Sequence, residues 1–276
     1  MLTLEQLQSG LTLCIDKPCQ WTSFQAVNKV KSTIRRLYGV KNIKIGHAGT
    51  LDPLATGLLL VCIGKATKSI PTLQDADKVY TGTMILGATT PCYDREQAID
   101  HFYPYEHISR QLLEETRGRF EGTLMQVPPM FSAVKVDGQR AYLYARADDP
   151  SVTIQPKPVN IYSFELTDFR QGDSMLPEGT AKPATSQVCA APKSRTHLYD
   201  NPQCIIPSHL PQADFRVRCG KGTYIRSLAR DFGATLGSGA FLASLRREQI
   251  GDYHEAEAIP LEAVEEHLRN MTYSQP

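Results

Sequence analysis

The run LLLVCI at residues 58–63 is the feature that most constrains the fold, because it directly follows the stretch GHAGTLDPLATG at residues 46–57. Six consecutive apolar residues present no polar side to water, so the run is expected to belong to the core, as a strand or a short helix that ends at Gly64. The stretch rich in Gly, Thr and Pro before it is therefore joined directly to a buried element.

The segments around this run predict a mixed α+β domain. Residues 22–39 have the pattern of a helix, since Thr22 and Gln25 have the spacing of a capping box and Gly39 stands where a C-terminal cap belongs. The expected inward side of this helix consists of Phe24, Val27, Val30, Ile34 and Leu37. Further helices are expected within 107–120 and late in 214–237, and strands within 11–18, 78–87, 164–169 and early in 214–237. Such irregular alternation favours the α+β class.

Basic residues are concentrated in the N-terminal part of the chain. Residues 17–68 contain nine Lys or Arg and a single acid, Asp52, whereas the rest of the chain has 21 basic and 28 acidic residues. Three of the cations fall outside the apolar side of the predicted helix and are expected to face outward: Lys29, Arg35 and Arg36. Such a cluster is either a solvated helix face or a surface that binds a polyanion such as a nucleic acid.

Other features of the sequence narrow the class of protein. No apolar run reaches the roughly 20 residues of a membrane span, and MLTLEQLQSG lacks the parts of a signal peptide, so a cytoplasmic protein is expected. Seven cysteines without a CxxC pair fit a reducing compartment. Cys189, His197, Cys204 and His209 have no common zinc spacing, so no metal is expected. Residues 171–212, rich in Pro, Ser, Thr, Gln and Gly, predict a surface insertion, and residues 253–276 an acidic, partly helical tail.

The glycine-rich stretches match no common cofactor or hydrolase motif. GKG at 220–222 lacks the spacing of a dinucleotide site, GTLDPLATG lacks the end of a P-loop, and the sequence has no HExxH or GxSxG. The candidate that remains is Asp52, which has no second acid nearby and lies in a stretch made rigid by glycines, threonines and Pro53. Asp52 either caps a turn or is a catalytic carboxylate acting at C1′ of a sugar.

The segment KGTYIR at residues 221–226 offers partners for such a carboxylate. Arg226 facing Asp52 would keep the carboxylate ionised, and Tyr224 would stack on a base or move a proton. The alternative makes Tyr224 a core ring and Arg226 a surface charge. Tyr80, in the strand predicted at 78–87, is open to the same two interpretations.

Five segments, in order along most of the chain, resemble the tRNA pseudouridine synthases of the TruB type. They are DKP followed by TS (16–23), KIGHAGTLDPLATGLLLVCIGKATK (44–68), DKVYTGTMILGATT (77–90), QVPPMFSAVKVDGQRAYLYAR (126–146) and VRCGKGTYIRSLARDFGATLGSGAFLASLRR (217–247). The resemblance implies a pseudouridine-synthase-type α+β fold, with a mixed, largely antiparallel sheet flanked by helices in one catalytic domain at 1–252. It implies that uridine 55 in the T-loop of tRNA is isomerised, by cleaving the C1′–N1 bond and rejoining the base through C5.

The resemblance also implies roles for individual residues. Asp52 matches the catalytic aspartate, Tyr80 the tyrosine that stacks on the target base and takes part in C5 proton removal, and Arg226 the arginine paired with the aspartate. The resemblance implies that Tyr224 and Leu245 contact the base in the pocket and that His47 helps to hold the T-loop once the base has left it. The residues that it implies for phosphate contacts are Lys29, Arg35, Arg36, Lys44, Lys65 and Lys68. Residues 127–160 correspond to a mobile loop that closes on RNA. No cofactor, metal, membrane or obligatory protein partner is implied, so a monomer that binds tRNA is expected.

Three departures from the family pattern affect these expectations. Gln20 stands where the family usually has glycine, which is expected to strain the first loop, and the 171–212 insertion exceeds the family core. The chain ends soon after LRREQIGDY, so a full C-terminal PUA domain is expected to be absent and RNA binding to be more sensitive to salt. A non-catalytic RNA-binding or tRNA-folding protein of the same fold is the main alternative, and a nucleoside or glycoside hydrolase is a third.

Overall fold

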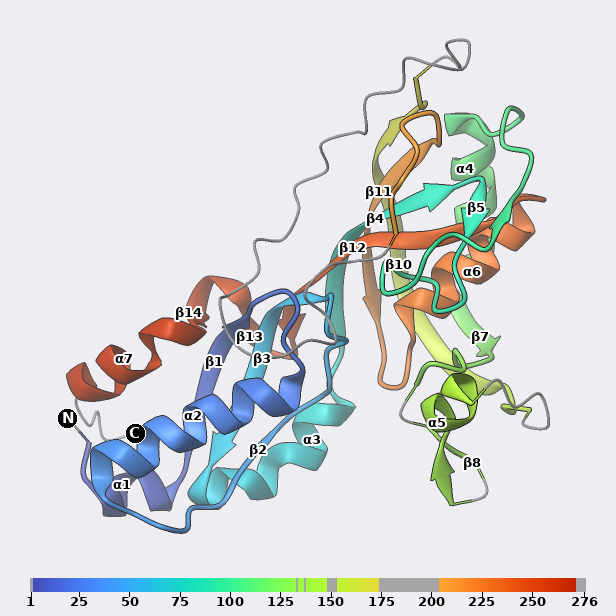
Figure 1. Cartoon of the computed structure of the whole chain (residues 1–276). Coiled ribbons are helices and arrows are strands. Elements are labelled where there is room, and N and C mark those ends of the chain that lie inside the picture. The colour runs from blue at the N-terminus through green and yellow to red at the C-terminus, as the bar shows by residue number, and fades with distance from the viewer. Residues whose placement is uncertain (1, 133, 137, 148–152, 174–203, 272–276) are drawn as a thin grey trace. The chain divides into compact units, whose positions relative to one another are not determined.

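The computed structural model describes residues 2–132, 134–136, 138–147, 153–173 and 204–271 (Figure 1). The described residues form two compact units. The first unit comprises residues 2–80 and 246–271, and the second comprises the described parts of 81–173 and 204–245. Strands β4 (Lys78–Leu86) and β12 (Ala240–Ile250) contribute residues to both units.

The first unit is a sheet with helices packed on it. Its other strands are β1 (Leu11–Lys17), β2 (Ile45–His47), β3 (Thr56–Ile63), β13 (Tyr253–His254) and β14 (Ile259–Pro260). Its helices are α1 (Leu4–Ser9), α2 (Ser23–Tyr38), α3 (Ile70–Asp75) and α7 (Val264–Asn270), with 3₁₀ turns at Gly64–Ser69, Glu255–Glu257 and Leu261–Ala263. The strand order is β14-β1-β3-β12, where β1 and β2 are antiparallel to β3, and β12 is parallel to β3.

The apolar run at 58–63 is a strand, β3, and it is covered on both faces. Leu59, Val61 and Ile63 belong to a core that α2 and α7 cover, as Figure 1 shows. Leu58 and Leu60 belong to a second core on the opposite face. A strand buried on both faces has no polar side, which explains why its sequence is continuously apolar rather than alternating.

The predicted helix at 22–39 is confirmed as α2, with both of its ends. Thr22 is the N-cap, both hydrogen bonds of the capping box with Gln25 are formed, and Gly39 follows the helix with a left-handed φ of 63°. The expectation that Phe24 points inward is wrong, because its side chain is 70% exposed. At 100° per residue, Phe24 lies roughly 90° from the centre of the stripe formed by Val27, Val30 and Ile34.

The second unit continues the α+β pattern. Its other strands are β5 (Ala88–Thr89), β6 (His101–Phe102), β7 (Gly122–Gln126), β8 (Lys135–Val136), β9 (Gln139–Arg140), β10 (Lys157–Arg170) and β11 (Gln212–Cys219). Its helices are α4 (Arg110–Arg117), α5 (Ala141–Arg146) and α6 (Ile225–Thr235), with a 3₁₀ turn at Gly118–Phe120. The order is β12-β4-β11-β10-β7, and β10 is antiparallel to both neighbours. The helix predicted within 107–120 is shorter than expected, and the strand predicted at 164–169 is longer.

Four phenylalanine rings join the helices of the second unit to its sheet. Phe164 of β10 packs edge-on against Phe215 of β11 and Phe232 of α6, with ring centroids 6.1 and 5.3 Å apart. Phe120, after α4, contacts Phe232 at 5.4 Å. Edge-to-face packing of buried rings adds to the free energy gained from burial, so this cluster fixes α6 on the sheet.

Parts of several expectations lie outside the described residues. These parts are 174–203 of the predicted insertion, which include Cys189 and His197, and residues 133, 137 and 148–152 of the predicted mobile loop. In the described part of the chain, no three His, Cys, Asp or Glu side chains gather as they would around a metal ion. No described helix combines the length and apolar character that crossing a membrane requires.

Replacing the N-cap of α2 tests how much the capping box contributes to the stability of the first unit. Thr22→Ala removes the hydrogen bond that the Thr22 hydroxyl accepts from the Gln25 N–H at 3.1 Å, so the free energy of unfolding is expected to fall by about 1 kcal/mol. Urea denaturation measures this change. Thr22→Ser keeps the cap and is the matched control, and an equal loss in both variants would contradict the capping role.

Candidate active site

Asp52 lies in the loop that joins β2 to β3 in the first unit. The N–H of Ala48 donates to the Leu60 carbonyl at the start of the loop, at 3.0 Å. The N–H of Ala55 donates to the carbonyl of Asp52 at 3.1 Å, which closes a turn with Pro53 at its second position, where proline is favoured. The Asp52 side chain is half-buried. The loop therefore starts and ends on fixed hydrogen bonds.

Lys17, the last residue of β1, holds the loop directly after Asp52. Its side chain is fully buried, and its ammonium group donates to the carbonyls of Pro18 (2.9 Å), Trp21 (2.6 Å) and Pro53 (3.2 Å). Lysine is rarely buried without such partners, because removing the charge from water is costly. The cation thus links the DKP segment to the residue that follows Asp52.

Arg247 of β12 holds the loop on its other side. Its guanidinium donates to the carbonyls of Leu58 (2.8 Å), Thr50 (3.5 Å) and Gly49 (3.1 Å), and the side chain is 1% exposed. Strand register explains this position, because Arg247 lies opposite Gly57 across the parallel β12–β3 pair. A Cβ at Gly57 would lie 2.3 Å from the Arg247 carbonyl oxygen, so only glycine lets the strands approach this closely.

Three residues near the start of α2 complete the support of the loop. The buried hydroxyl of Ser23 accepts from the N–H of Leu51 at 2.8 Å and donates to its carbonyl at 3.1 Å. The Cys19 thiol donates to the Leu54 carbonyl at 3.5 Å, and the Gln20 N–H donates to the Pro53 carbonyl at 2.8 Å. Gln20 has a left-handed φ of 66°, the conformation that glycine adopts without strain, so strain at this departure from the family pattern is confirmed.

His47 ends β2, five residues before Asp52. Burial lowers the pKa of His47 below its ordinary value, a backbone hydrogen bond at Gly49 opposes this shift, and the positive charge of Arg247 adds to it. The imidazole is therefore neutral near pH 7. A neutral ring is suited to stacking and hydrogen bonding rather than to pairing with phosphate.

The second unit carries the other group of predicted site residues. The turn before α6 is closed by the Thr223 hydroxyl, which donates to the Gly220 carbonyl at 2.9 Å, and Gly222 has a φ of 78°. Tyr224 is the half-buried N-cap of α6, and Arg226 follows in the first turn of the helix. Because α6 begins at Ile225, Tyr224 and Arg226 do not share a face as residues two apart in a strand would.

Arg226 is 5% exposed and is surrounded by oxygen acceptors. Its guanidinium donates to the carbonyls of Cys92 (3.1 Å) and Phe131 (2.9 Å), and it forms an ion pair with the buried Asp94 at 3.7 Å. The interpretation of Arg226 as a surface charge is therefore wrong. Two further predicted residues lie where the chain passes from one unit to the other. Tyr80 is the last residue of the first unit's N-terminal segment and is buried on β4. Leu245 is the last residue of the second unit and is half-buried on β12.

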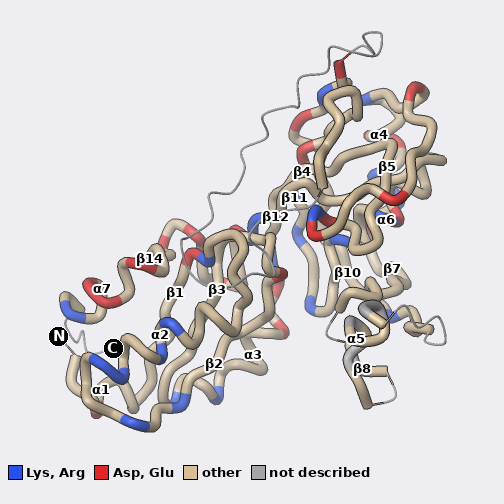
Figure 2. The backbone as a smooth tube through the Cα atoms, viewed as in Figure 1, with Lys and Arg blue, Asp and Glu red and all other residues tan. Residues whose placement is uncertain are grey.

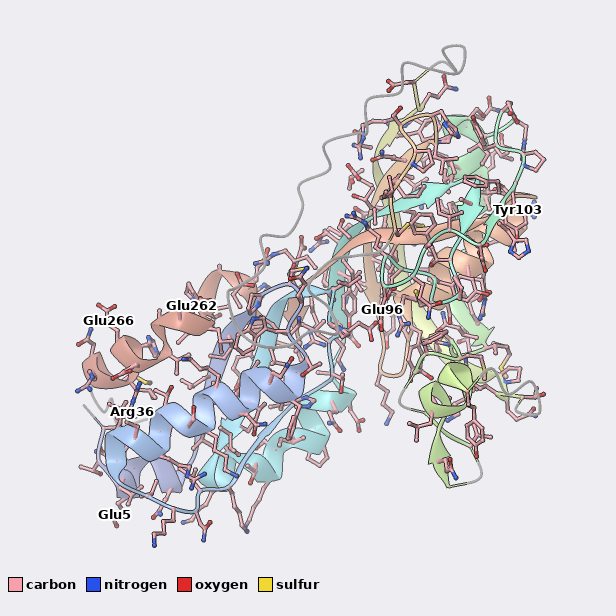
Figure 3. The ribbon with its side chains drawn as sticks, viewed as in Figure 1. Glu5, Arg36, Glu96, Tyr103, Glu262 and Glu266 are labelled. Atoms are coloured by element: carbon pink, nitrogen blue, oxygen red, sulfur yellow. The ribbon has the colours of Figure 1, made fainter. Side chains whose placement is uncertain are left out.

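The predicted phosphate-binding residues fall into two groups in the first unit. Lys44, Lys65 and Lys68 line one pocket of about 270 Å³ together with Gln8, Asn42, Ile43, Gly64 and Thr67, and none of these described lining residues is acidic. Lys29, Arg35 and Arg36 lie on α2, and Arg36 forms an ion pair with Glu265 of α7. Figure 2 shows Lys and Arg along the segment between α2 and β2 and acidic residues on α7, and Figure 3 labels Arg36 with Glu262 and Glu266.

Comparison with known proteins gives the family. The family model "TruB family pseudouridylate synthase (N terminal domain)" matches residues 35–180, and "tRNA pseudouridylate synthase B C-terminal domain" matches residues 226–274. The chain is 45% identical over 269 residues to a protein of Flavobacterium johnsoniae named tRNA pseudouridine synthase B, covering 97% of this chain and all of that protein. The chain belongs to the TruB family of pseudouridylate synthases. A TruB protein of Phocaeicola vulgatus with the same name is 43% identical, covering 95% of this chain and 94% of its own.

Solved structures agree on the fold. A chain in the crystal structure of a Cbf5-Nop10-Gar1 complex matches with a TM-score of 0.61 and 25% identity over 95% of this chain, which spans 55% of that chain. An H/ACA RNP bound to a substrate RNA containing 2′-deoxyuridine has a chain with a TM-score of 0.58 and 22% identity, covering 95% of this chain and 54% of that one. The expected pseudouridine-synthase-type α+β fold is confirmed, as is the resemblance to the TruB family.

Four residues that shape these sites were not predicted. Lys17 could have been found, because it follows Leu13 and Ile15 on the inward side of the alternating strand β1. Arg247, Ser23 and Asp94 had no such signal, since each becomes important only when the fold brings distant segments together.

Replacing Lys17 tests the support of the Asp52 loop. Lys17→Met keeps the length of the side chain but removes a donor from three partly buried carbonyls, of which that of Pro53 keeps another donor, the Gln20 N–H. The free energy of unfolding is therefore expected to fall by about 1–3 kcal/mol. Catalytic turnover is expected to fall as well, in conditions where circular dichroism shows the variant folded. Thr3→Ala, which removes the N-cap of α1 in the same unit, is the control that lowers stability without touching the loop. Full activity in a folded Lys17→Met variant would contradict the supporting role.

Proposed function

We propose that this chain isomerises uridine 55 in the T-loop of tRNA to pseudouridine. The observation that carries the proposal is the match to proteins named tRNA pseudouridine synthase B over nearly the whole chain, at 43–45% identity. The support of the Asp52 loop by Lys17 and Arg247 is consistent with it, because a catalytic carboxylate requires a rigid mount.

The chemistry suits a single carboxylate. Isomerisation breaks the C1′–N1 and C5–H bonds and forms C1′–C5 and N1–H bonds on the same base, so the C5 proton is lost and no water has to be activated as a nucleophile. A glycoside hydrolase generally needs a second carboxylate at a set separation, and isomerisation does not. Asp52 acts on the ribose either by adding to C1′ or by removing the 2′ proton, and both routes are compatible with the proposal.

The remaining site residues are proposed to hold the base and the aspartate. Extruding a uridine costs a few kcal/mol, which stacking on Tyr80 and apolar contact with Leu245 would offset. Arg226 is proposed to pair with Asp52, and Tyr224 to line the base pocket. His47 is proposed to help hold the T-loop once the base has left it, a role that suits its neutral ring.

The basic pocket is proposed to hold the RNA backbone. Lys44, Lys65 and Lys68 gather positive charge in one place with amide and hydroxyl donors, which favours a phosphate. On α2, Lys29 and Arg35 are proposed as further contacts, whereas RNA would have to displace Glu265 from Arg36. Residues 127–160 are proposed as a further RNA-binding segment. We also propose a catalytic domain at 1–252 with a short acidic tail, acting as a cytoplasmic monomer on tRNA, without a cofactor or protein partner.

Removing the carboxylate tests the catalytic proposal. Wild-type protein is expected to release tritium from T-loop RNA labelled at C5 of uridine, and Asp52→Asn to lose at least about 10³-fold in rate while still binding RNA. Binding without release by either protein would favour the non-catalytic alternative. Free uracil on chromatography would favour a hydrolase.

Replacing the pocket lysines tests how the RNA backbone is bound. Lys65→Ala with Lys68→Ala is expected to weaken binding of T-loop RNA and to reduce the slope of log K against log salt by about 0.7–0.9 for each phosphate that is no longer neutralised. The rate at saturating RNA is expected to stay unchanged. Lys41→Ala is the matched control, because this exposed lysine lies in the same basic segment but does not line the pocket. An equal effect of the control would contradict a phosphate site in the pocket.

A further inference from the structure

Gln126, the last residue of β7, forms an unusual contact with the start of α6. Its side chain is 4% exposed, and its Oε1 accepts from the backbone N–H of Tyr224 at 2.8 Å. Tyr224 is the N-cap of α6, but its own side chain makes no capping hydrogen bond. The backbone N–H of the N-cap residue is therefore bound by a side chain that is 98 residues away in sequence.

The residues after Gln126 are attached to the same helix. The buried hydroxyl of Ser227 donates to the Val127 carbonyl at 2.8 Å, and the Arg230 guanidinium donates to the same oxygen at 3.0 Å. Arg226 donates to the Phe131 carbonyl at 2.9 Å. The backbone at 126–131 and the first turn of α6 thus form one hydrogen-bonded assembly within the second unit.

This assembly also determines where the Arg226 guanidinium lies. Its acceptors include two backbone carbonyls, of Cys92 and Phe131, and the carboxylate of Asp94. Phe131 belongs to the segment that Gln126 begins. Movement of α6 relative to that segment would therefore change both the position of Tyr224 and the contacts of Arg226.

We propose that Gln126 is a positioning residue for Tyr224 and Arg226 in the isomerisation. The inference rests on the proposed function, which gives those two side chains their roles at the base and the aspartate. Glutamine suits this place because its side-chain carbonyl reaches the Tyr224 N–H from a strand end and accepts its hydrogen bond. Displacement of a reacting group by about 1 Å costs up to about 10²-fold in rate, so the loss of a single hydrogen bond at this turn is expected to be visible in turnover.

Two variants of Gln126 separate positioning from folding. Gln126→Met keeps the length but removes the acceptor, and it is expected to lower kcat on T-loop RNA by about tenfold or more while KM changes little. Gln126→Glu keeps both the length and an acceptor oxygen, and it is expected to restore most of the wild-type kcat. If Gln126→Met does not fold, Ser227→Ala removes one hydrogen bond from the same assembly and is expected to lower kcat in the same way.

Ser109→Ala is the control for stability. It removes the N-cap of α4 in the same unit and is expected to lower Tm while kcat stays at the wild-type value. A folded Gln126→Met variant with wild-type kcat, or equal losses in Gln126→Met and Gln126→Glu, would overturn the positioning role. Wild-type protein that is inactive on T-loop RNA would instead overturn the proposed function from which the inference starts.

Discussion

The first unit depends on two buried cations that hold the backbone on either side of Asp52. Lys17 and Arg247 are almost entirely removed from water, and each donates to three carbonyl oxygens. Carbonyl oxygens satisfy the donor groups of a buried cation, so the two side chains fix the backbone of the loop that carries Asp52.

The strands bring these cations to the loop by register. β1 and β12 flank β3, and Lys17 and Arg247 both lie opposite Gly57, where the loop enters the strand. Any larger residue at Gly57 would push β12 away, since the Arg247 backbone already occupies the space of a side chain. The motif GHAGTLDPLATG therefore carries a packing requirement at its last glycine in addition to the carboxylate of Asp52.

The sequence pattern was sufficient to predict elements that are determined by residues close together in the chain. The ends of α2 follow from Thr22, Gln25 and Gly39, and the core position of β3 follows from its apolar run. Long-range contacts could not be predicted in this way. The ion pair between Arg226 and Asp94 joins residues 132 positions apart, and only tertiary packing brings them together. Phe24 was misplaced because it lies roughly 90° from the centre of the buried stripe of α2, and helical spacing alone does not show how wide the covering surface is.

We propose that a carboxylate held in this way meets the ribose of an everted uridine. A crystal structure of the Asp52→Asn variant with a T-loop RNA tests this proposal, because the variant retains the size of the side chain and is expected to prevent turnover. In such a complex the target uridine is expected to leave the T-loop with its ribose against the side chain at position 52, and the hydrogen bonds of Lys17 and Arg247 to the loop are expected to persist. A uridine still stacked within the T-loop, with its ribose away from that side chain, would contradict it.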